Sequence, residues 1–309
     1  MVSHLGKALL IINPTAQSGR GAQSGRYATQ VLQAALGADS FESVLTKESG
    51  HGRLLAEKAQ DFDTVIALGG DGLVHEVING LMTIPEANRP RFALLPVGTG
   101  NDYARTLHMS FSIEESVEQL LSARETLFDL GLCNGEYFAE TLSFGLDADI
   151  AIDTVERRKR TGKTGTRLFL ESGIDVLFHR KIKHSYEAQF DGEVAMQDEM
   201  YQFAVQIGKT YGGGFNICPN ARTDDGLLDI CIAHPPMSIL KATIIFLLAK
   251  NAHHTRFKQI EFAQAQSLYL SFPQANKLPI QIDGEAFAGH EFEISCVSSA
   301  LRVLVNDKL

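Results

Sequence analysis

The chain has 309 residues, of which 44% are hydrophobic and 21% are charged, and this composition excludes a disordered protein and predicts a folded globular one. A formal net charge of −9 argues against a nucleic-acid partner, because broad affinity for phosphates requires a basic surface. The four cysteines are scattered without a CxxC pair, which is typical of reduced core residues and favours a cytoplasmic location.

The first 130 residues alternate short apolar runs with helical patterns. The predicted strands span 7–14, 41–46, 63–70 and 91–98, and the predicted helices span 25–37, 52–60 and 73–82. Alternation of this kind predicts a parallel sheet with helices on both faces. Ligands bind such sheets at the carboxyl ends of the strands.

Beyond Asp129 the alternation of strand and helix patterns gives way to short β-like segments. Short β-like segments span 140–150, 184–194, 200–208, 227–234 and 266–272. They predict an antiparallel β-sandwich, interrupted by one helical insertion from about Ile150 to Phe178. "SILKATIIFLLAK" predicts a short amphipathic helix, and "ALRVLVN" a final strand that returns to the first domain. The predicted domains are therefore 1–129 plus 297–309, and 130–296.

Glycines surround a single acid in the stretch "ALGGDGLVHEVINGLM". Gly69, Gly70 and Gly72 flank Asp71 between a strand and a helix, where bare backbone amides and a helix N-terminus favour a phosphate. Asp71 would repel a phosphate, so a Mg²⁺ ligand or an acceptor of a substrate proton is the better reading. A tight turn with an N-capping aspartate is the alternative for this segment alone.

Two further loops repeat the arrangement after other strands. "PVGTGND" places Gly98 and Gly100 next to the neutral Thr99 and Asn101 and a second acid, Asp102. "NPTAQSGRG" occupies the equivalent place after the first strand. Three such loops at one sheet edge predict a phosphate-binding crevice.

The sequence "GGDGLVHEVING", followed by "LPVGTGNDYAR", resembles the diacylglycerol kinase catalytic domain, whose family includes soluble bacterial diacylglycerol kinases and the sphingosine and ceramide kinases. The resemblance continues in "YGGGFNICPNARTDDGLLDI" and "QIDGEAF" and covers nearly the whole chain. It implies a phosphofructokinase-like three-layer α/β domain followed by an antiparallel β-sandwich, with ATP bound in the cleft between them.

The resemblance also implies roles for individual residues. Asp71 would act through Mg²⁺ or on the acceptor hydroxyl, and Glu285 corresponds to the proposed general base of the bacterial enzymes. A structural Mg²⁺ site would use Asp225 with the carbonyl groups of Arg222 and Leu227. The ATP site would be lined by Asn13, Pro14, Thr15, Ala16, Gln17, Thr46, Gly69, Gly70, Gly72, Leu73, Glu76, Gly98, Thr99, Gly100, Asn101 and Asp102. By itself, the "DGE" turn of Glu285 is more typical of a solvated hairpin tip.

The implied reaction transfers the γ-phosphate of ATP to the hydroxyl of a lipid alcohol, most directly diacylglycerol, to give phosphatidic acid. Leu73 and His75 are closer to the sphingosine-kinase version of the motif, so a sphingoid base or another lipid is an alternative acceptor. NAD kinases, which share the GGDG loop, are a second alternative, and a non-catalytic lipid or nucleotide sensor is a third. A homodimer is compatible with the sequence.

A basic stretch precedes and follows an apolar segment within the predicted insertion. Its residues are Arg157, Arg158, Lys159, Arg160, Lys163, Arg167, Arg180, Lys181 and Lys183. Basic residues near an anionic bilayer contribute about 1 kcal/mol each. We therefore predict transient association with the inner membrane face, with a solvated helix face as the alternative. The GKT within this stretch lacks the upstream glycine and strand of a P-loop.

Overall fold

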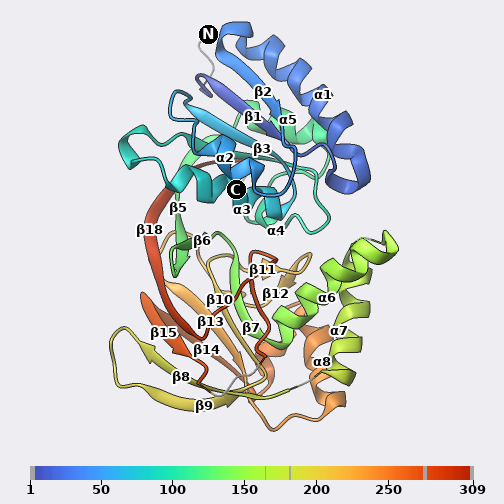
Figure 1. The fold of residues 1–309 in the computed structure, drawn as a ribbon, viewed down its shortest axis with the longest axis vertical. Coiled ribbons are helices and arrows are strands. Elements are labelled where there is room, and N and C mark those ends of the chain that lie inside the picture. Colours follow the sequence, from blue (N-terminus) through green and yellow to red (C-terminus); the bar gives the residue numbers. More distant parts are fainter. Residues whose placement is uncertain (1–3, 164, 181, 274–276, 307–309) are drawn as a thin grey trace. The chain divides into compact units, whose positions relative to one another are not determined.

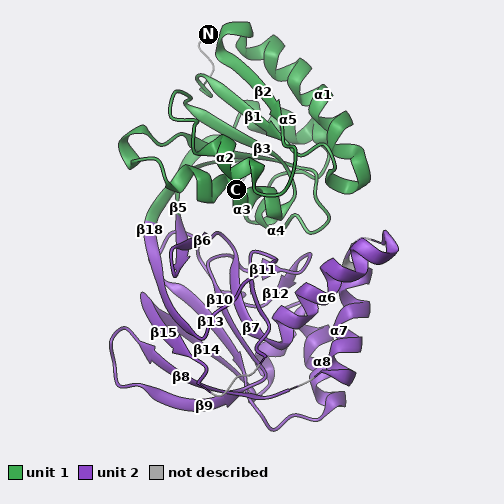
Figure 2. Cartoon of the chain, in the orientation of Figure 1, with its two compact units in different colours: residues 1–128, 299–309 green, residues 129–298 purple. Residues whose placement is uncertain are grey.

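The computed structural model describes residues 4–163, 165–180, 182–273 and 277–306. The chain forms two compact units (Figure 2). Unit 1 comprises Met1–Phe128 together with Ser299–Leu309, and unit 2 comprises Asp129–Ser298. The C-terminal segment thus returns to the first unit, as "ALRVLVN" predicts.

The chain passes between the units twice, in two long strands. These are β5 (Arg124–Cys133) and β18 (Glu291–Val305). The predicted domain boundaries, after residue 129 and before residue 297, lie inside these strands.

Unit 1 is built on a parallel sheet with the strand order β2–β1–β3–β4, to which the end of β18 adds beside β4 (Figure 1). The strands are β1 (Ala8–Ile12), β2 (Phe41–Leu45), β3 (Thr64–Gly69) and β4 (Arg91–Pro96). Every residue of β1 and β3 is buried, as expected for parallel strands covered on both faces. Continuous apolar runs, rather than alternating ones, therefore mark these strands in the sequence.

The helices of unit 1 follow the strands. They are α1 (Ala16–Leu36), α2 (His51–Ala56), α3 (Asp71–Met82), α4 (Asp102–Thr106) and α5 (Ile113–Leu121), with short 3-10 turns at Ala38–Ser40 and Glu86–Asn88. Helix α1 packs beside α5, and α2 packs beside α3. Helix α5 begins where the Ser112 side chain accepts a hydrogen bond from the Glu115 amide, an N-cap that fixes its start.

Helix α1 begins earlier than predicted, at Ala16 rather than at Gly25. Its first turn is kinked, with positive φ angles at Gln17, Ser18 and Gly19. A Cβ at Gly21 would lie 2.1 Å from the carbonyl oxygen of Asn13, so only glycine allows the helix to approach β1 this closely. The glycine-rich loop of the prediction is therefore mostly a distorted helix start.

Unit 2 is a sandwich of two antiparallel sheets, with the strand orders β18–β15–β8–β9 and β14–β13–β10–β7–β16–β17. The strands are β7 (Thr141–Gly145), β8 (His184–Phe190), β9 (Met196–Met200), β10 (Gln202–Gln206), β13 (Leu228–Ala233), β14 (Ile260–Ala265), β15 (Ser267–Ser271), β16 (Ile280–Ile282) and β17 (Glu285–Ala286). Shorter pairs are β6 (Glu136–Phe138) with β5, and β11 (Thr210–Tyr211) with β12 (Phe215–Asn216).

Aromatic side chains from both sheets fill the sandwich. Phe144 of β7 meets Phe292 of β18 with ring centroids 4.9 Å apart, and Tyr186 of β8 meets Phe203 of β10 at 5.3 Å. All four side chains are buried in one hydrophobic cluster. Such edge-to-face contacts add to the stabilisation that burial alone supplies.

Three helices of unit 2 lie side by side (Figure 1). They are α6 (Leu146–Thr161), α7 (Thr166–His179) and α8 (Ile239–Ala249), followed by a 3-10 turn at His253–Arg256. The prediction of a β-like segment over 140–150 is wrong after Gly145, where α6 begins. The predicted single insertion is two helices, because Gly162 adopts a left-handed conformation that ends α6.

Helix α8 forms where a short amphipathic helix is predicted, but it is not amphipathic. Its buried side carries Ala242, Ile245 and Ala249, while Leu240 and Leu247 are exposed on the other. In the described part of the chain, no helix combines the length and the apolar character that crossing a membrane requires.

Candidate active site

Three loops meet at the carboxyl ends of β1, β3 and β4. A Cβ at Gly70, after β3, would lie 3.0 Å from the Cα atom of Gly98, after β4. The Gln17 side chain, after β1, donates a hydrogen bond to the Gly98 carbonyl at 2.6 Å. The structure therefore brings together the three loops that the sequence singles out, and close backbone contact explains two of their glycines.

The loop after β1 is organised by Asn13. Its side-chain oxygen accepts hydrogen bonds from the amide and the hydroxyl of Thr15, at 3.0 and 2.9 Å. The backbone amide of Asn13 donates to the Leu68 carbonyl at 2.9 Å, which connects this loop to β3. Pro14 and Ala16 complete the turn. Thr46, which follows β2, donates its backbone amide to the Ile12 carbonyl at 2.8 Å.

The loop after β3 leads directly into α3. Gly70 is the extended residue before the helix, and no side chain caps the first turn, so the reading of Asp71 as an N-cap of this helix is wrong. The amides of Leu73 and Val74 bond back to the Gly70 carbonyl. The positive end of the helix thus lies beside Gly70 and Gly72, as a phosphate site requires.

Asp71 instead binds the start of a different helix. Its Oδ1 accepts hydrogen bonds from the amides of Asp102 at 2.9 Å and Tyr103 at 3.4 Å, at the beginning of α4. A Cβ at Gly100 would lie 2.7 Å from Asp71 Oδ2 and 3.2 Å from Asp102 Oδ2. Both carboxylates therefore point to the same place, which only a glycine leaves open.

The Asp102 carboxylate contributes to the raised pKa of Asp71. Burial, followed by the neighbouring Asp102 carboxylate, raises the pKa of Asp71 to about 7. Asp102 is buried, and Arg105 approaches it at 3.7 Å from its Nε to Asp102 Oδ1. Asn101, with a φ of 52°, holds the turn between them by accepting a hydrogen bond from the Gly98 amide at 2.8 Å.

This pair of carboxylates fits a Mg²⁺ ion that arrives with phosphates. Mg²⁺ is commonly held by one or two carboxylates plus phosphate oxygens and water. No group of three or more His, Cys, Asp or Glu side chains that could hold a metal occurs within the described ranges. Asp71 and Asp102 would therefore hold the ion only in part, and a nucleotide would complete its shell.

Two of the predicted ATP-site side chains have structural contacts of another kind. Glu76 accepts hydrogen bonds from the amides of Gly50 at 2.7 Å and Gly52 at 2.9 Å, which fixes the loop before α2. Leu73 is buried, and its methyl groups lie where a Cβ of Gly69 or Gly52 would be. The Leu73 side chain is therefore a packing element under the loop.

In unit 2, the "DGE" turn separates a structural acid from an exposed one. Asp283 accepts hydrogen bonds from the amides of Ala139, Glu140 and Thr141, all at 2.9 to 3.0 Å. Glu285 is exposed in β17. The role of Asp283 was missed in the sequence, because its partners lie some 140 residues away in the chain.

The segment predicted to hold a structural Mg²⁺ is a compact turn. Asp225 Oδ1 accepts a hydrogen bond from the Leu227 amide at 3.1 Å, and Arg222 binds Asp224 at 3.1 Å. Asp129 closes the turn from outside, since its Oδ2 accepts from the Gly226 amide at 2.7 Å. The metal role of Arg222, Asp225 and Leu227 and the catalytic role of Glu285 stay predictions.

Comparison with known proteins identifies two protein families that match this chain. Residues 7–133 match the diacylglycerol kinase catalytic domain, and residues 141–305 match the YegS C-terminal NAD kinase beta sandwich-like domain. A diacylglycerol kinase of Staphylococcus aureus (strain bovine RF122 / ET3-1) is 26% identical over 281 residues, which cover 90% of this chain and 86% of that protein.

Solved structures share the fold. A diacylglycerol kinase from Bacillus anthracis str. Sterne superposes with a TM-score of 0.78 at 24% identity, with 98% of each chain covered. An NAD kinase from Archaeoglobus fulgidus in complex with ATP superposes with a TM-score of 0.53 at 13% identity, over 97% of this chain and 94% of that one. The predicted fold class, α/β followed by an antiparallel sandwich, is confirmed.

Proposed function

Because the chain belongs to the diacylglycerol kinase catalytic-domain family, we propose that it transfers the γ-phosphate of ATP to the hydroxyl of a lipid, with diacylglycerol as the favoured acceptor. One observation carries the proposal at the level of atoms. The loops after β1, β3 and β4 meet where Gly70 lies against Gly98 and Gln17 bonds to Gly98, next to the paired carboxylates of Asp71 and Asp102.

The residues of this site suit phosphoryl transfer, which depends mainly on positioning and on neutralising phosphate charge. The amides after β3 and β4 would hold the phosphates, and Gln17 keeps the first and third loops in register. Mg²⁺, when bound, would neutralise the charge that Asp71 and the phosphates share. Glu285 would accept the proton of the lipid hydroxyl as the general base.

A panel of acceptors with labelled ATP tests the proposal. The purified protein is incubated with Mg-ATP and with diacylglycerol, sphingosine, ceramide or NAD, and the labelled product is identified. Label on diacylglycerol supports the favoured acceptor, and label on a sphingoid base moves the assignment within the lipid kinases. Label on NAD alone would replace the proposal with NAD kinase, whose fold is related.

We also propose that the protein reaches its lipid by peripheral contact with a bilayer. The basic stretch contributes less to this than its charge count indicates, because most of its described members pair with acids. The pairs are Arg157 with Asp153 and Asp175, Arg180 with Asp149 and Asp153, Lys163 and Arg167 with Glu171, and Lys183 with Glu199. Lys181 lies outside the described residues.

Exposed hydrophobic side chains on α7 and α8 offer a better contact. Phe178 is 56% exposed on α7, and Leu240 and Leu247 are 72% and 46% exposed on the adjacent α8. Exposed apolar side chains grouped on neighbouring helices are typical of interaction sites. A bilayer is the occupant we propose, because the proposed acceptor is itself a lipid.

A further inference from the structure

The turn that carries Glu285 is held at both of its central residues. Asp283 and Gly284 have φ angles of 46° and 89° and connect β16 to β17. Two successive residues of positive φ are typical of a tight hairpin turn. Asp283 accepts from the amides of 139–141 through its carboxylate, and its own backbone amide donates to the Thr141 carbonyl at 2.8 Å. The first central residue is therefore fixed by the segment before β7.

The second central residue is held by Gln281. A hairpin turn gives the amide of this residue no partner of its own, because the hydrogen bond of the turn joins the two residues that flank the central pair. In this chain the Gly284 amide donates to Gln281 Oε1 at 2.7 Å. Gln281 lies in β16 and is only 1% exposed, while Ile280 and Ile282 on either side of it face the sandwich core. The Gln281 side chain therefore points to the opposite face of the sheet, where it is buried and needs polar partners.

A second hydrogen bond fixes the orientation of the Gln281 side chain. A backbone amide can only donate, so the oxygen of Gln281 faces Gly284 and its nitrogen faces the other way. Nε2 donates to the Ser143 hydroxyl oxygen at 2.7 Å, and Ser143, on the adjacent strand β7, is fully buried. Ser143 in turn donates a hydrogen bond to the Asp147 carboxylate. A chain of hydrogen bonds thus connects the turn of Glu285 to the start of α6.

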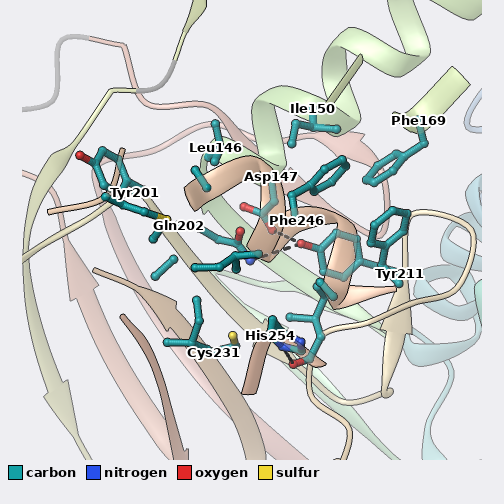
Figure 3. Close-up of a pocket in the computed structure, with 18 residues that line it drawn as sticks. Leu146, Asp147, Ile150, Phe169, Tyr201, Gln202, Tyr211, Cys231, Phe246 and His254 are labelled. Atoms are coloured by element: carbon teal, nitrogen blue, oxygen red, sulfur yellow. Dashed lines mark hydrogen bonds between the residues drawn. The ribbon is translucent and has the colours of Figure 1, made fainter. Parts of the chain in front are cut away.

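Asp147 determines the direction of this chain of hydrogen bonds. It is buried in the first turn of α6, and its Oδ2 accepts a hydrogen bond from the Tyr211 hydroxyl at 2.6 Å (Figure 3). Burial raises the pKa of Asp147 to about 6, against the effect of the Tyr211 and Ser143 hydroxyl groups, so the group is mostly ionised at pH 7.5. An ionised carboxylate can only accept, so the Ser143 hydroxyl gives its proton to Asp147 and accepts from Gln281.

Glu285 itself is exposed, so its position depends on the backbone of the turn rather than on packing around its side chain. We infer that Gln281 is a positioning residue for phosphotransfer, because its bond to the Gly284 amide holds the turn that presents Glu285. Ser143 keeps the Gln281 amide in the orientation that this bond requires. The inference rests on the proposed function in taking Glu285 to be the general base. A misplacement of about 1 Å in a reacting group can cost about 10²-fold in rate.

Gln281→Met tests the inference, because methionine keeps the length of the side chain and removes both hydrogen bonds. With diacylglycerol as acceptor we expect kcat to fall about 10- to 100-fold and the KM for Mg-ATP to stay unchanged. Ser143→Ala leaves the bond to Gly284 but frees the Gln281 amide, and it should cause a smaller loss. Gln206→Met is the matched control, because Gln206 is fully buried in β10 of the same sheet and its side-chain amide has no hydrogen-bond partner among the described residues. It should keep the parental kcat, and an equal loss in Gln206→Met and Gln281→Met overturns the inference.

A double-mutant cycle separates positioning of Glu285 from a general loss of structure. In the Glu285→Gln background, Gln281→Met should change kcat little, because the group through which Gln281 acts has already been removed. An equal fold-loss in the parent and Glu285→Gln backgrounds would show that Gln281 acts on another part of the protein, and it overturns the inference. Thermal unfolding of each variant shows that it is folded.

Hydrogen exchange at the Gly284 amide is a measurement that does not depend on activity. In NMR spectra of the ¹⁵N-labelled full chain, this amide should exchange on the order of tenfold more slowly in the parent than in Gln281→Met. Equal exchange in the two proteins overturns the hydrogen bond and the inference with it. A parent that phosphorylates no lipid overturns the proposed function and, with it, the positioning role. An active parent that Gln281→Met equals in kcat overturns the positioning role alone.

Discussion

Replacing Asp71 by asparagine should stabilise the protein while removing its activity. Burial and the adjacent Asp102 raise the pKa of Asp71 from 3.8 to about 7. A carboxyl group with a raised pKa holds its proton more tightly in the folded than in the unfolded state. Its contribution to stability is therefore fully present below about pH 4 and is lost as the pH rises through about 7. Asparagine carries no charge at any of these pH values, yet keeps an oxygen that can accept from the Asp102 amide.

The magnitude follows from the displaced pKa. A change from 3.8 to about 7 corresponds to about 4 kcal/mol in the free energy of unfolding at alkaline pH. Asp71 is only half-buried, and solvent screens part of the interaction, so we expect Asp71→Asn to gain about 2 kcal/mol at pH 8. At pH 4 the parent carboxyl is protonated, and the gain should vanish.

Unfolding is followed by far-UV circular dichroism in urea, because the chain has no tryptophan. Asp61→Asn, on the exposed surface of the same unit, is the control and should change the free energy of unfolding little at either pH. Phosphotransfer is assayed in parallel and should be lost only in Asp71→Asn. A variant that is no more stable than the parent at pH 8, or that gains equally at pH 4, would refute the reasoning.

Three further predictions address other parts of the molecule. Gly98→Ala should lose phosphotransfer and about 1–3 kcal/mol of stability, since its Cβ would lie 2.4 Å from the Gly70 Cα; steady-state kinetics and thermal unfolding measure both. Glu285→Gln should slow phosphotransfer by about 10²–10⁴-fold without changing the unfolding temperature, whereas Asp283→Ala should lower that temperature because three backbone amides lose their acceptor. Leu240→Glu combined with Leu247→Glu should reduce co-sedimentation with anionic lipid vesicles several-fold, since both side chains would carry charge into the bilayer.

Controls decide how these results are read. Leu45→Glu introduces the same charge at a 53% exposed leucine of unit 1 and should leave vesicle binding unchanged. If the α8 variant binds vesicles normally but loses self-association, the exposed face contacts a second copy of the chain. Full activity of Glu285→Gln would remove the general-base assignment and leave the ATP-site geometry untouched.

The α/β order of unit 1 is readable in the sequence because its strands are continuous buried runs that end in glycine loops. The start of α1 is not readable in the same way. Its buried positions are small residues, Gly21, Gly25 and Ala28, with Leu32 the single large one, so the segment shows little hydrophobic periodicity. Close packing against β1, rather than side-chain hydrophobicity, holds this part of the helix.

The strand-to-helix change at Gly145 is hidden for a related reason. "ETLSFGLDADI" alternates apolar and polar residues like a strand, yet α6 begins at Leu146. Gly145 has a φ of 87°, and a Cβ there would lie 2.4 Å from the Tyr201 carbonyl oxygen. The buried face of α6 then includes Asp147 and Asp153, which a hydrophobic pattern cannot predict.

Three aspartates of the chain share one local arrangement, an Asp-Gly turn whose carboxylate accepts hydrogen bonds from backbone amides. The surroundings of each aspartate determine which of them is a candidate for catalysis. Asp71, Asp191 and Asp283 each precede a glycine, and each carboxylate accepts backbone amides from a distant segment. For Asp283 the tethered segment is 139–141, and the result is a fixed hairpin. For Asp71 the tethered segment carries an acid of its own, Asp102. Burial and this neighbouring carboxylate together raise the pKa of Asp71. The Asp-Gly motif therefore determines where the carboxylate is held. The partner segment determines whether the carboxylate only fixes the backbone, as Asp283 does, or forms with a second acid a negative site that a cation can balance, as Asp71 does with Asp102.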